Sequence, residues 1–272
     1  MTVRARLRAL LARVRPAPEP PIPGRKLYRV LHEYGHAFPE TFFVQVGAND
    51  GQGEDPLRRQ LARRRWSGIM VEPVPYVFER LVHNVGDNPR VALENTAIAD
   101  ADTTRPIYFL APAEPGADLP DYYDKLGSFD RDVLLKQRDV IPDIDARVRS
   151  LDVPCLTFES LCTKHRVERI DLVQIDTEGY DFEIIKLIDL DRWRPKVVMF
   201  ENFHMTPQVH AECVDHLRTH GYDALSDGMD TLALRLGGDS AGDRAIDDYW
   251  RALAADYVPD SYGPGFPEPG LT

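Results

Sequence analysis

Short apolar runs recur along the chain, and an amphipathic segment with a period near 3.6 residues follows most of them. Such short continuous runs are typical of strands that are buried on both faces of a sheet. Strands that alternate with helices form parallel sheets with right-handed crossovers. The sequence therefore predicts an α/β fold with a mostly parallel sheet and helices on both faces. The segments that predict strands are 41–47, 68–73, 90–100, 105–110, 170–176 and 195–202.

The predicted sheet ends in a hairpin, because 222–235 holds two β-like runs joined by a turn at Gly228. We expect one main domain over residues 39–238. Residues 1–38 are predicted to be an N-terminal basic helix and a Pro-rich linker, and residues 239–272 a C-terminal helix and tail. Within the main domain, residues 111–150 lose the regular pattern and are rich in Pro, Gly, Asp and Tyr. An irregular segment of this length is more often functional than filler, so we expect a lid over a substrate.

The N-terminal segment MTVRARLRALLARVRP interleaves arginines with Leu and Val, a pattern typical of a basic amphipathic helix. One interpretation is peripheral contact with an anionic membrane. The simpler interpretations are a frayed leader or a helix that packs on another subunit of a homo-oligomer. The prolines of PAPEPPIPG then end the helix.

Charge and cysteine content exclude several classes of partner. The formal net charge of −11 and pI of about 5.2 oppose binding to nucleic acid. The three cysteines show neither zinc-site nor disulfide spacing. No apolar stretch approaches the roughly 20 residues needed to span a bilayer, and the N-terminus lacks the apolar core of a secretion signal. We therefore expect a cytoplasmic protein that acts on a small molecule.

A glycine-containing loop follows the first predicted strand, in the run VQVGANDG. Gly47 and Gly51 would let backbone amides approach a ligand closely. A dinucleotide-binding loop has the spacing GxGxxG, but Asn49 stands at its second glycine. Glu72 ends the second strand, where a carboxylate can accept hydrogen bonds from ribose hydroxyls. Since nicotinamide sites use the same device, these residues indicate an adenosine without naming the cofactor.

Five runs in fixed order carry a resemblance to a known family: FFVQVGANDG, GIMVEP, NTAIAD, IDLVQIDTEGYDFEII and VVMFEN. Together they resemble the FkbM-type methyltransferases over roughly residues 42–235. The resemblance implies the Rossmann-like class I methyltransferase fold, a mostly parallel seven-stranded sheet that ends in an antiparallel hairpin. It also implies S-adenosylmethionine as the cofactor and transfer to oxygen on sugars, glycans or polyketide-like products. Gln45 stands where these proteins usually have an acidic residue that helps to hold the amino-acid part of the cofactor.

The resemblance also implies which residues bind the cofactor. It places the first loop against the methionine and ribose, Glu72 at the ribose hydroxyls, and Asn95 to Ala97 near the adenine. Ligands of open α/β sheets lie beyond the carboxyl ends of the strands, where these residues fall. Asp176 ends another strand there and joins the set. The loop residues are Gly47, Ala48, Asn49 and Gly51.

The transferred methyl is already electrophilic, so the protein mainly has to align a hydroxyl and accept its proton. Asp176 and Glu201 each end an apolar strand and are expected side by side at the sheet edge. His204 is the candidate base, because imidazole titrates near neutral pH. Alternatively, Asp176, Glu201 and Asn202 hold Mg²⁺, as in the similar macrolide-sugar methyltransferases. The sequence leaves base and metal open.

Two further functions compete with methyl transfer to a sugar, glycan or glycosylated small molecule. The glycine loop and Glu72 also fit a nicotinamide-dependent oxidoreductase, although the loop spacing and the final hairpin oppose it. A non-catalytic module that retains the fold is the third alternative, and Gln45 is its one hint in the sequence.

Overall fold

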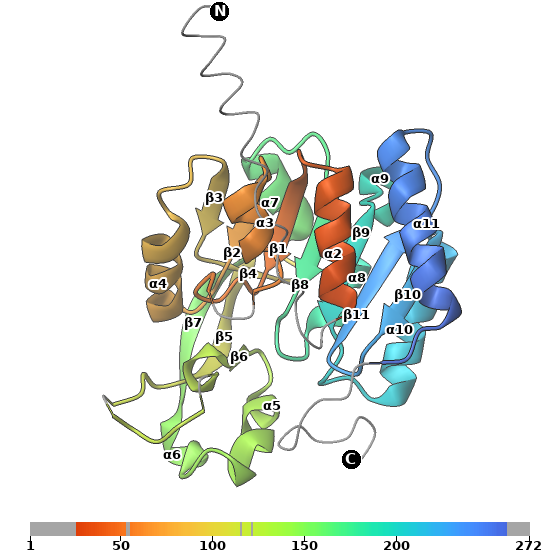
Figure 1. Cartoon of the computed structure of the whole chain (residues 1–272). Coiled ribbons are helices and arrows are strands. Elements are labelled where there is room, and N and C mark those ends of the chain that lie inside the picture. Colours follow the sequence, from red (N-terminus) through yellow and green to blue (C-terminus); the bar gives the residue numbers. More distant parts are fainter. Residues whose placement is uncertain (1–25, 53–54, 115, 121, 260–272) are drawn as a thin grey trace, which may run out of the picture.

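A seven-stranded sheet forms the centre of the computed structural model, which describes residues 26–52, 55–114, 116–120 and 122–259 (Figure 1). The strand order is β10-β11-β9-β8-β1-β2-β3. All neighbouring strands pair in parallel except β11, which is antiparallel to both β9 and β10. This topology confirms the predicted α/β fold and its terminal hairpin. The strands are β1 (Phe42–Val46), β2 (Ser67–Val71), β3 (Val91–Glu94), β8 (Leu172–Ile175), β9 (Val197–Glu201), β10 (Tyr222–Ser226) and β11 (Asp230–Arg235).

Helices cover both faces of this sheet, as expected, because its strands are apolar on both faces. In β1, Val44 and Val46 face one helical layer while Phe43 faces the other. The first layer is α7 (Phe158–Lys164), α8 (Asp181–Leu187), α9 (Leu190–Trp193) and α10 (Pro207–Thr219). The second is α2 (Lys26–Ala37), α3 (Arg58–Arg63), α4 (Pro75–Val85) and α11 (Ala241–Ala255).

A second, four-stranded sheet was not expected. Its order is β4-β7-β5-β6, with β5 antiparallel to both β7 and β6. The prediction of one continuous third strand over 90–100 was wrong, because the chain passes there from β3 into β4. Asn95 Nδ2 donates to the carbonyls of Glu72 and Pro73, and Thr96 Oγ1 donates to the carbonyl of Pro154. The strands are β4 (Ala97–Ile98), β5 (Thr103–Leu110), β6 (Gly127–Ser128) and β7 (Val148–Leu156).

The predicted irregular segment 111–150 is folded around a small apolar core of its own. Tyr123, Leu134 and Ile141 are buried there against Leu110 of β5. The run RDVLLKQ within this segment forms α5 and the first half of η2. The segment ends sooner than expected, since its last residues already belong to β7. Its helices are η1 (Tyr123–Lys125), α5 (Arg131–Leu135), η2 (Lys136–Asp139) and α6 (Ile144–Arg147).

The two helices outside the predicted main domain pack on the same core. Leu27, Leu31 and Tyr34 of α2 are buried against the sheet, and Trp250 of α11 is fully buried. The sequence did not predict α2, which lies within residues 1–38, whereas α11 was expected. The division of the chain into segments stays a prediction. The basic segment 1–16, the linker 16–24 and the tail from residue 260 lie outside the described residues.

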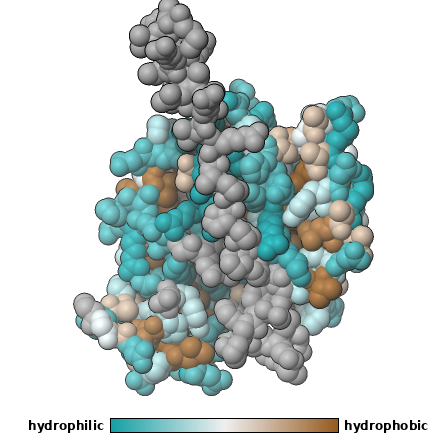
Figure 2. All heavy atoms as spheres, viewed as in Figure 1, coloured by the Kyte–Doolittle hydropathy of each residue, from teal (hydrophilic) through white to brown (hydrophobic). Residues whose placement is uncertain are grey.

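The described surface seen in Figure 2 is mainly hydrophilic, with apolar side chains in small separate groups. Among the described helices, none combines the length and apolarity needed to cross a membrane.

Candidate active site

A cavity of about 1460 Å³ opens at the carboxyl ends of β1, β2, β8 and β9. The loops that follow these strands line it, together with part of the second sheet and of residues 111–150. The position is the one where open parallel sheets bind ligands. Among the predicted site residues, the cavity is lined by Gly47, Ala48, Asn49, Glu72, Ala97, Asp176, Glu201 and His204.

The loop after β1 is held against both neighbouring strands. The backbone N–H groups of Gly47 and Ala48 both donate to the carbonyl of Val71, at 3.0 and 2.9 Å. Gly47 has a φ of +79°, and a Cβ there would stand 1.6 Å from the carbonyl oxygen of Asp176. Only glycine fits this close approach. The glycine loop (residues 47–51) and the Asp176 segment are therefore in direct backbone contact.

Glu72 is bonded to the same loop. Its side chain accepts from the backbone N–H of Asn49 at 3.1 Å and from that of Val74 at 2.8 Å. Glu72 is only 6% exposed, and burial raises its pKa to about 7, although the two N–H groups oppose the rise. Each carboxylate oxygen has a second lone pair for a ligand hydroxyl.

Gly51 and Asn95 support the cavity wall rather than line it. A Cβ on Gly51 would meet the side chains of Val85 and Leu81 of α4, at 2.7 and 2.9 Å. Asn95 is the residue that joins the ends of β2 and β3 through its amide. Thr96, which the sequence included only within a range, lines the cavity beside Ala97.

Two buried glutamines reach the cavity from neighbouring strands. Gln45 and Gln174 are paired in the register of β1 and β8, and each is at most 4% exposed. Neither Oε1 atom has a hydrogen-bond partner within the described part of the chain. Asp55 also lines the cavity, and burial raises its pKa to about 6. The sequence singled out Gln45 alone, since only the register reveals Gln174 beside it.

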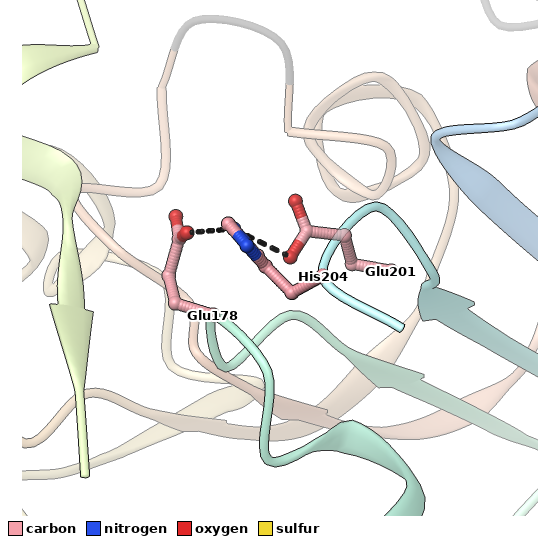
Figure 3. Close-up of side chains that lie close together, drawn as sticks. All are labelled: Glu178, Glu201 and His204. Carbon is pink, nitrogen blue, oxygen red and sulfur yellow. Dashed lines mark hydrogen bonds and ion pairs between the residues drawn. The ribbon is translucent and has the colours of Figure 1, made fainter. Parts of the chain in front are cut away.

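The loops after β8 and β9 bring together the groups shown in Figure 3, Glu178, Glu201 and His204. Nε2 of His204 lies 2.8 Å from Oε2 of Glu178 and 3.8 Å from Oε2 of Glu201. The β8–β9 register pairs Ile175 with Phe200, so Asp176 and Glu201 emerge next to each other, as expected.

Asn202, one of the three residues considered for Mg²⁺, lines the cavity with Asp176 and Glu201, but its side-chain oxygen is already hydrogen-bonded. Its Oδ1 accepts hydrogen bonds from Thr231 Oγ1 at 3.0 Å and from Ser226 Oγ at 3.3 Å. Glu178 also lies close to Glu201. Glu178 was not among the predicted site residues, because the loop geometry that turns it toward His204 is not visible in the sequence.

Carboxylates in this part of the cavity repel one another. The pKa of Asp176 is raised by enclosure among the surrounding loops and then by Glu178 and Asp181, although its side chain is open to the cavity. The pKa of Glu201 is raised for the same reasons, first by burial and then by Glu178 and Asp176. Burial raises the pKa of Asp181 to about 6, although Thr177 donates to its carboxylate. The site therefore favours bound protons or a cation.

Comparison with known proteins identifies the family. A family model described as "Methyltransferase FkbM domain" matches residues 45–224. The chain belongs to the FkbM methyltransferase family. The match spans the glycine loop, Glu72 and the Glu178–Glu201–His204 group of this FkbM-family protein. No curated protein matches the chain.

Several solved structures are also similar to this FkbM-family protein. A methyltransferase FkbM from Methylobacillus flagellatus is 11% identical with a TM-score of 0.45, and the match covers 72% of this chain and 44% of that one. A methyltransferase from Geobacter sulfurreducens is 12% identical with a TM-score of 0.41, over 86% and 96% of the two chains. A fibrillarin/Nop5p complex gives 12% identity and a TM-score of 0.39, over 79% and 83%.

Proposed function

We propose that this FkbM-family protein transfers a methyl group from S-adenosylmethionine to a hydroxyl of a sugar, glycan or glycosylated small molecule. One observation carries the proposal: a single cavity joins the glycine loop and Glu72 to the carboxylate and imidazole group. The first half suits an adenosine and the second suits a reacting hydroxyl. In-line methyl transfer requires the two halves to be adjacent.

The residues of the first half fit the cofactor. Glu72 would accept the ribose hydroxyls, and Thr96 and Ala97 would lie against the adenine. Gln45 and Gln174 line the cavity, and a rotation of either side chain would turn its buried, unpartnered Oε1 toward a donor-rich group such as the cofactor ammonium. S-Adenosylmethionine, when bound, supplies the electrophilic methyl group.

Asp176 is placed to receive the proton of the acceptor hydroxyl. Its side chain is open to the cavity, and its backbone carbonyl lies against Gly47 of the glycine loop. The other candidate, His204, has its Nε2 bonded to Glu178. A positioned base contributes about 10²- to 10⁴-fold to a proton transfer. Mg²⁺ held by Asp176, Glu201 and Asn202 is the weaker alternative, because the Asn202 oxygen is already bonded.

Aromatic side chains near the carboxylates support a sugar-like acceptor. Tyr122, Phe129 and Tyr180 line the cavity. Phe129 and Tyr180 stand edge to face at 5.1 Å, with Arg105 4.2 Å from the centroid of Phe129. The net charge of −11 favours such an acceptor over nucleic acid. We propose the cytoplasm as the place of the reaction. Peripheral membrane contact through the N-terminal segment and assembly into a homo-oligomer are also proposals.

Titration with S-adenosylmethionine and with NADH, followed by transfer of labelled methyl to glycosylated hydroxyl acceptors, tests the proposal. We expect S-adenosylmethionine to bind and label to appear on oxygen. Binding of NADH without S-adenosylmethionine would instead support the oxidoreductase alternative. Cofactor binding without transfer to any acceptor would support a non-catalytic module.

A further inference from the structure

Two carboxylates and one imidazole converge at the cavity wall. One potential ligand atom from each of Glu178, Glu201 and His204 lies within 4.8 Å of the other two (Figure 3). Protein ligands stand about 2.0–2.2 Å from a bound ion such as Zn²⁺, so atoms that share an ion are about 3–3.5 Å apart. The observed separations of 2.8 and 3.8 Å from Nε2 are close to that range. Small side-chain movements would therefore place all three around one ion.

The backbone holds the two loops in this arrangement. Glu178 has a left-handed φ of +53°, and its carbonyl accepts from Ser128 Oγ at 2.7 Å. At Gly179, a Cβ would lie 3.4 Å from the Cβ of His204, so the two loops are in close contact. The side chain of His204 is only 4% exposed. The potential ligands are therefore preorganised by their surroundings.

The cluster carries more negative charge than its positive partners offset. Oε2 of Glu201 is shielded from solvent and has no hydrogen-bond partner in the described part of the chain. Asp176, Asp181 and Asp230 are close enough to repel its charge. Among the described residues, no lysine or arginine forms an ion pair with Glu178 or Glu201. The basic group that both carboxylates share is the imidazole of His204. A bound proton or a cation is required to offset such a group.

We propose that Glu178, Glu201 and His204 bind a divalent transition-metal ion of the Mn²⁺ or Zn²⁺ class. The imidazole decides the class, because Mg²⁺ and Ca²⁺ prefer oxygen ligands alone while first-row transition metals accept nitrogen. Three protein ligands leave at least one coordination position free. All three residues line the cavity, so that position faces the ligand space.

For catalysis, the inference rests on the proposed function. An ion in this place would bind the acceptor oxygen, lower the pKa of its hydroxyl and fix its direction toward the methyl group. Asp176 follows β8 two residues before Glu178 and would take the released proton. His204 is then a ligand rather than a base.

Metal titration of the full chain tests the site. The protein is treated with chelator, exchanged into chelator-free buffer, and titrated with MnCl₂, ZnCl₂ and MgCl₂ in a calorimeter. We expect a single Mn²⁺ or Zn²⁺ per chain, bound at least about tenfold more tightly than Mg²⁺. Glu201→Gln and His204→Gln should each weaken binding by about 100-fold, since even loss of a ligand's supporting partner costs about 10- to 100-fold. His210→Gln is the matched control, because His210 also lines the cavity but bonds Thr231, and it should retain wild-type affinity.

Two results would overturn the site: Mg²⁺ that binds as tightly as Mn²⁺, or tight Mn²⁺ and Zn²⁺ binding that survives both ligand substitutions. Thermal melts followed by circular dichroism verify that the variants are folded. If one of them is unfolded, Glu178→Gln takes its place in the titration. The metal titration contains neither cofactor nor acceptor. Metal binding without S-adenosylmethionine binding would therefore overturn the proposed function alone, and the converse would overturn the metal site alone.

Discussion

Glu72 should make folding stability fall as the pH rises toward neutrality. Its carboxyl group is almost fully buried, and burial raises its pKa from an ordinary 4.5 to about 7. In the unfolded chain the group regains its ordinary pKa. Between these two values the unfolded state releases a proton that the folded state retains, so the free energy of unfolding decreases with pH. Below the lower value the effect is absent, and above the higher value it is complete.

The magnitude follows from the size of the shift. About 2.5 pKa units at about 1.36 kcal/mol each give roughly 3 kcal/mol of stability lost between about pH 4.5 and pH 7. Glu72→Gln cannot titrate, so this slope should disappear. The amide also turns a donor toward the N–H of Asn49 or Val74, which costs about 1–3 kcal/mol at every pH. The pH dependence, and not the absolute stability, is therefore the quantity to compare.

Urea unfolding at several values between about pH 5 and pH 8 measures this dependence. We expect the stability of Glu72→Gln relative to wild type to increase by roughly 2.5 kcal/mol across this range. Asp248→Asn is the control, because its side chain is 83% exposed on α11, and its curve should follow that of the wild type. Parallel curves for wild type and Glu72→Gln would refute the reasoning about burial.

The same group should couple cofactor binding to a proton. Ribose hydroxyls that donate to Glu72 favour its charged form, so binding near pH 7 should release a proton. Calorimetry in two buffers of different ionisation enthalpy detects this release. Glu72→Gln should abolish it and weaken S-adenosylmethionine binding by about 1.5–3 kcal/mol. An affinity equal to wild type would remove Glu72 from the cofactor site.

Three further predictions concern the cavity. Asp176→Asn should lower turnover by about 100-fold or more with little change in cofactor affinity, and wild-type rates in single-turnover assays would show that Asp176 is not the base. Gly47→Ala should greatly reduce both cofactor binding and thermal stability, because its Cβ would overlap the Asp176 carbonyl, and a normal melting curve would contradict that contact. Hydrogen exchange in residues 111–150 should slow when cofactor and acceptor are both bound, and rates that ligands leave unchanged would refute a lid.

The central sheet could be predicted because its strands are encoded locally. Each of β1, β2, β8 and β9 is a short apolar run bounded by turn or polar residues, and burial on both faces leaves little choice of structure. In the second sheet only β5 was predicted as a separate strand, over 105–110, and nothing local indicates its partner. The longest pairing of this sheet joins β5 to β7 across residues 111–147. Pro106 and Pro154 lie inside those strands, and proline ordinarily argues against a strand.

The sequence predicted those residues of the candidate site that lie at the ends of strands. Position after a parallel strand placed Glu72, Asp176 and Glu201 at one edge of the sheet. Partners chosen by loop geometry were not predictable in this way. Glu178 is bonded to His204 because the left-handed backbone at Glu178 and Gly179 turns the loop toward that side chain. Gln174 stands out only because the strand register pairs it with Gln45.

The second sheet and the 111–150 segment form one continuous excursion of the chain. The chain leaves the central sheet at Asn95, after β3, and returns at Thr157, before α7. Everything between these points can be lengthened, shortened or exchanged without breaking a hydrogen bond between strands of the central sheet. Under the proposed function, replacement of this one insert would change the acceptor side of the cavity while the glycine loop stayed the same. Acceptor preference should then travel with the insert when it is exchanged between two family members.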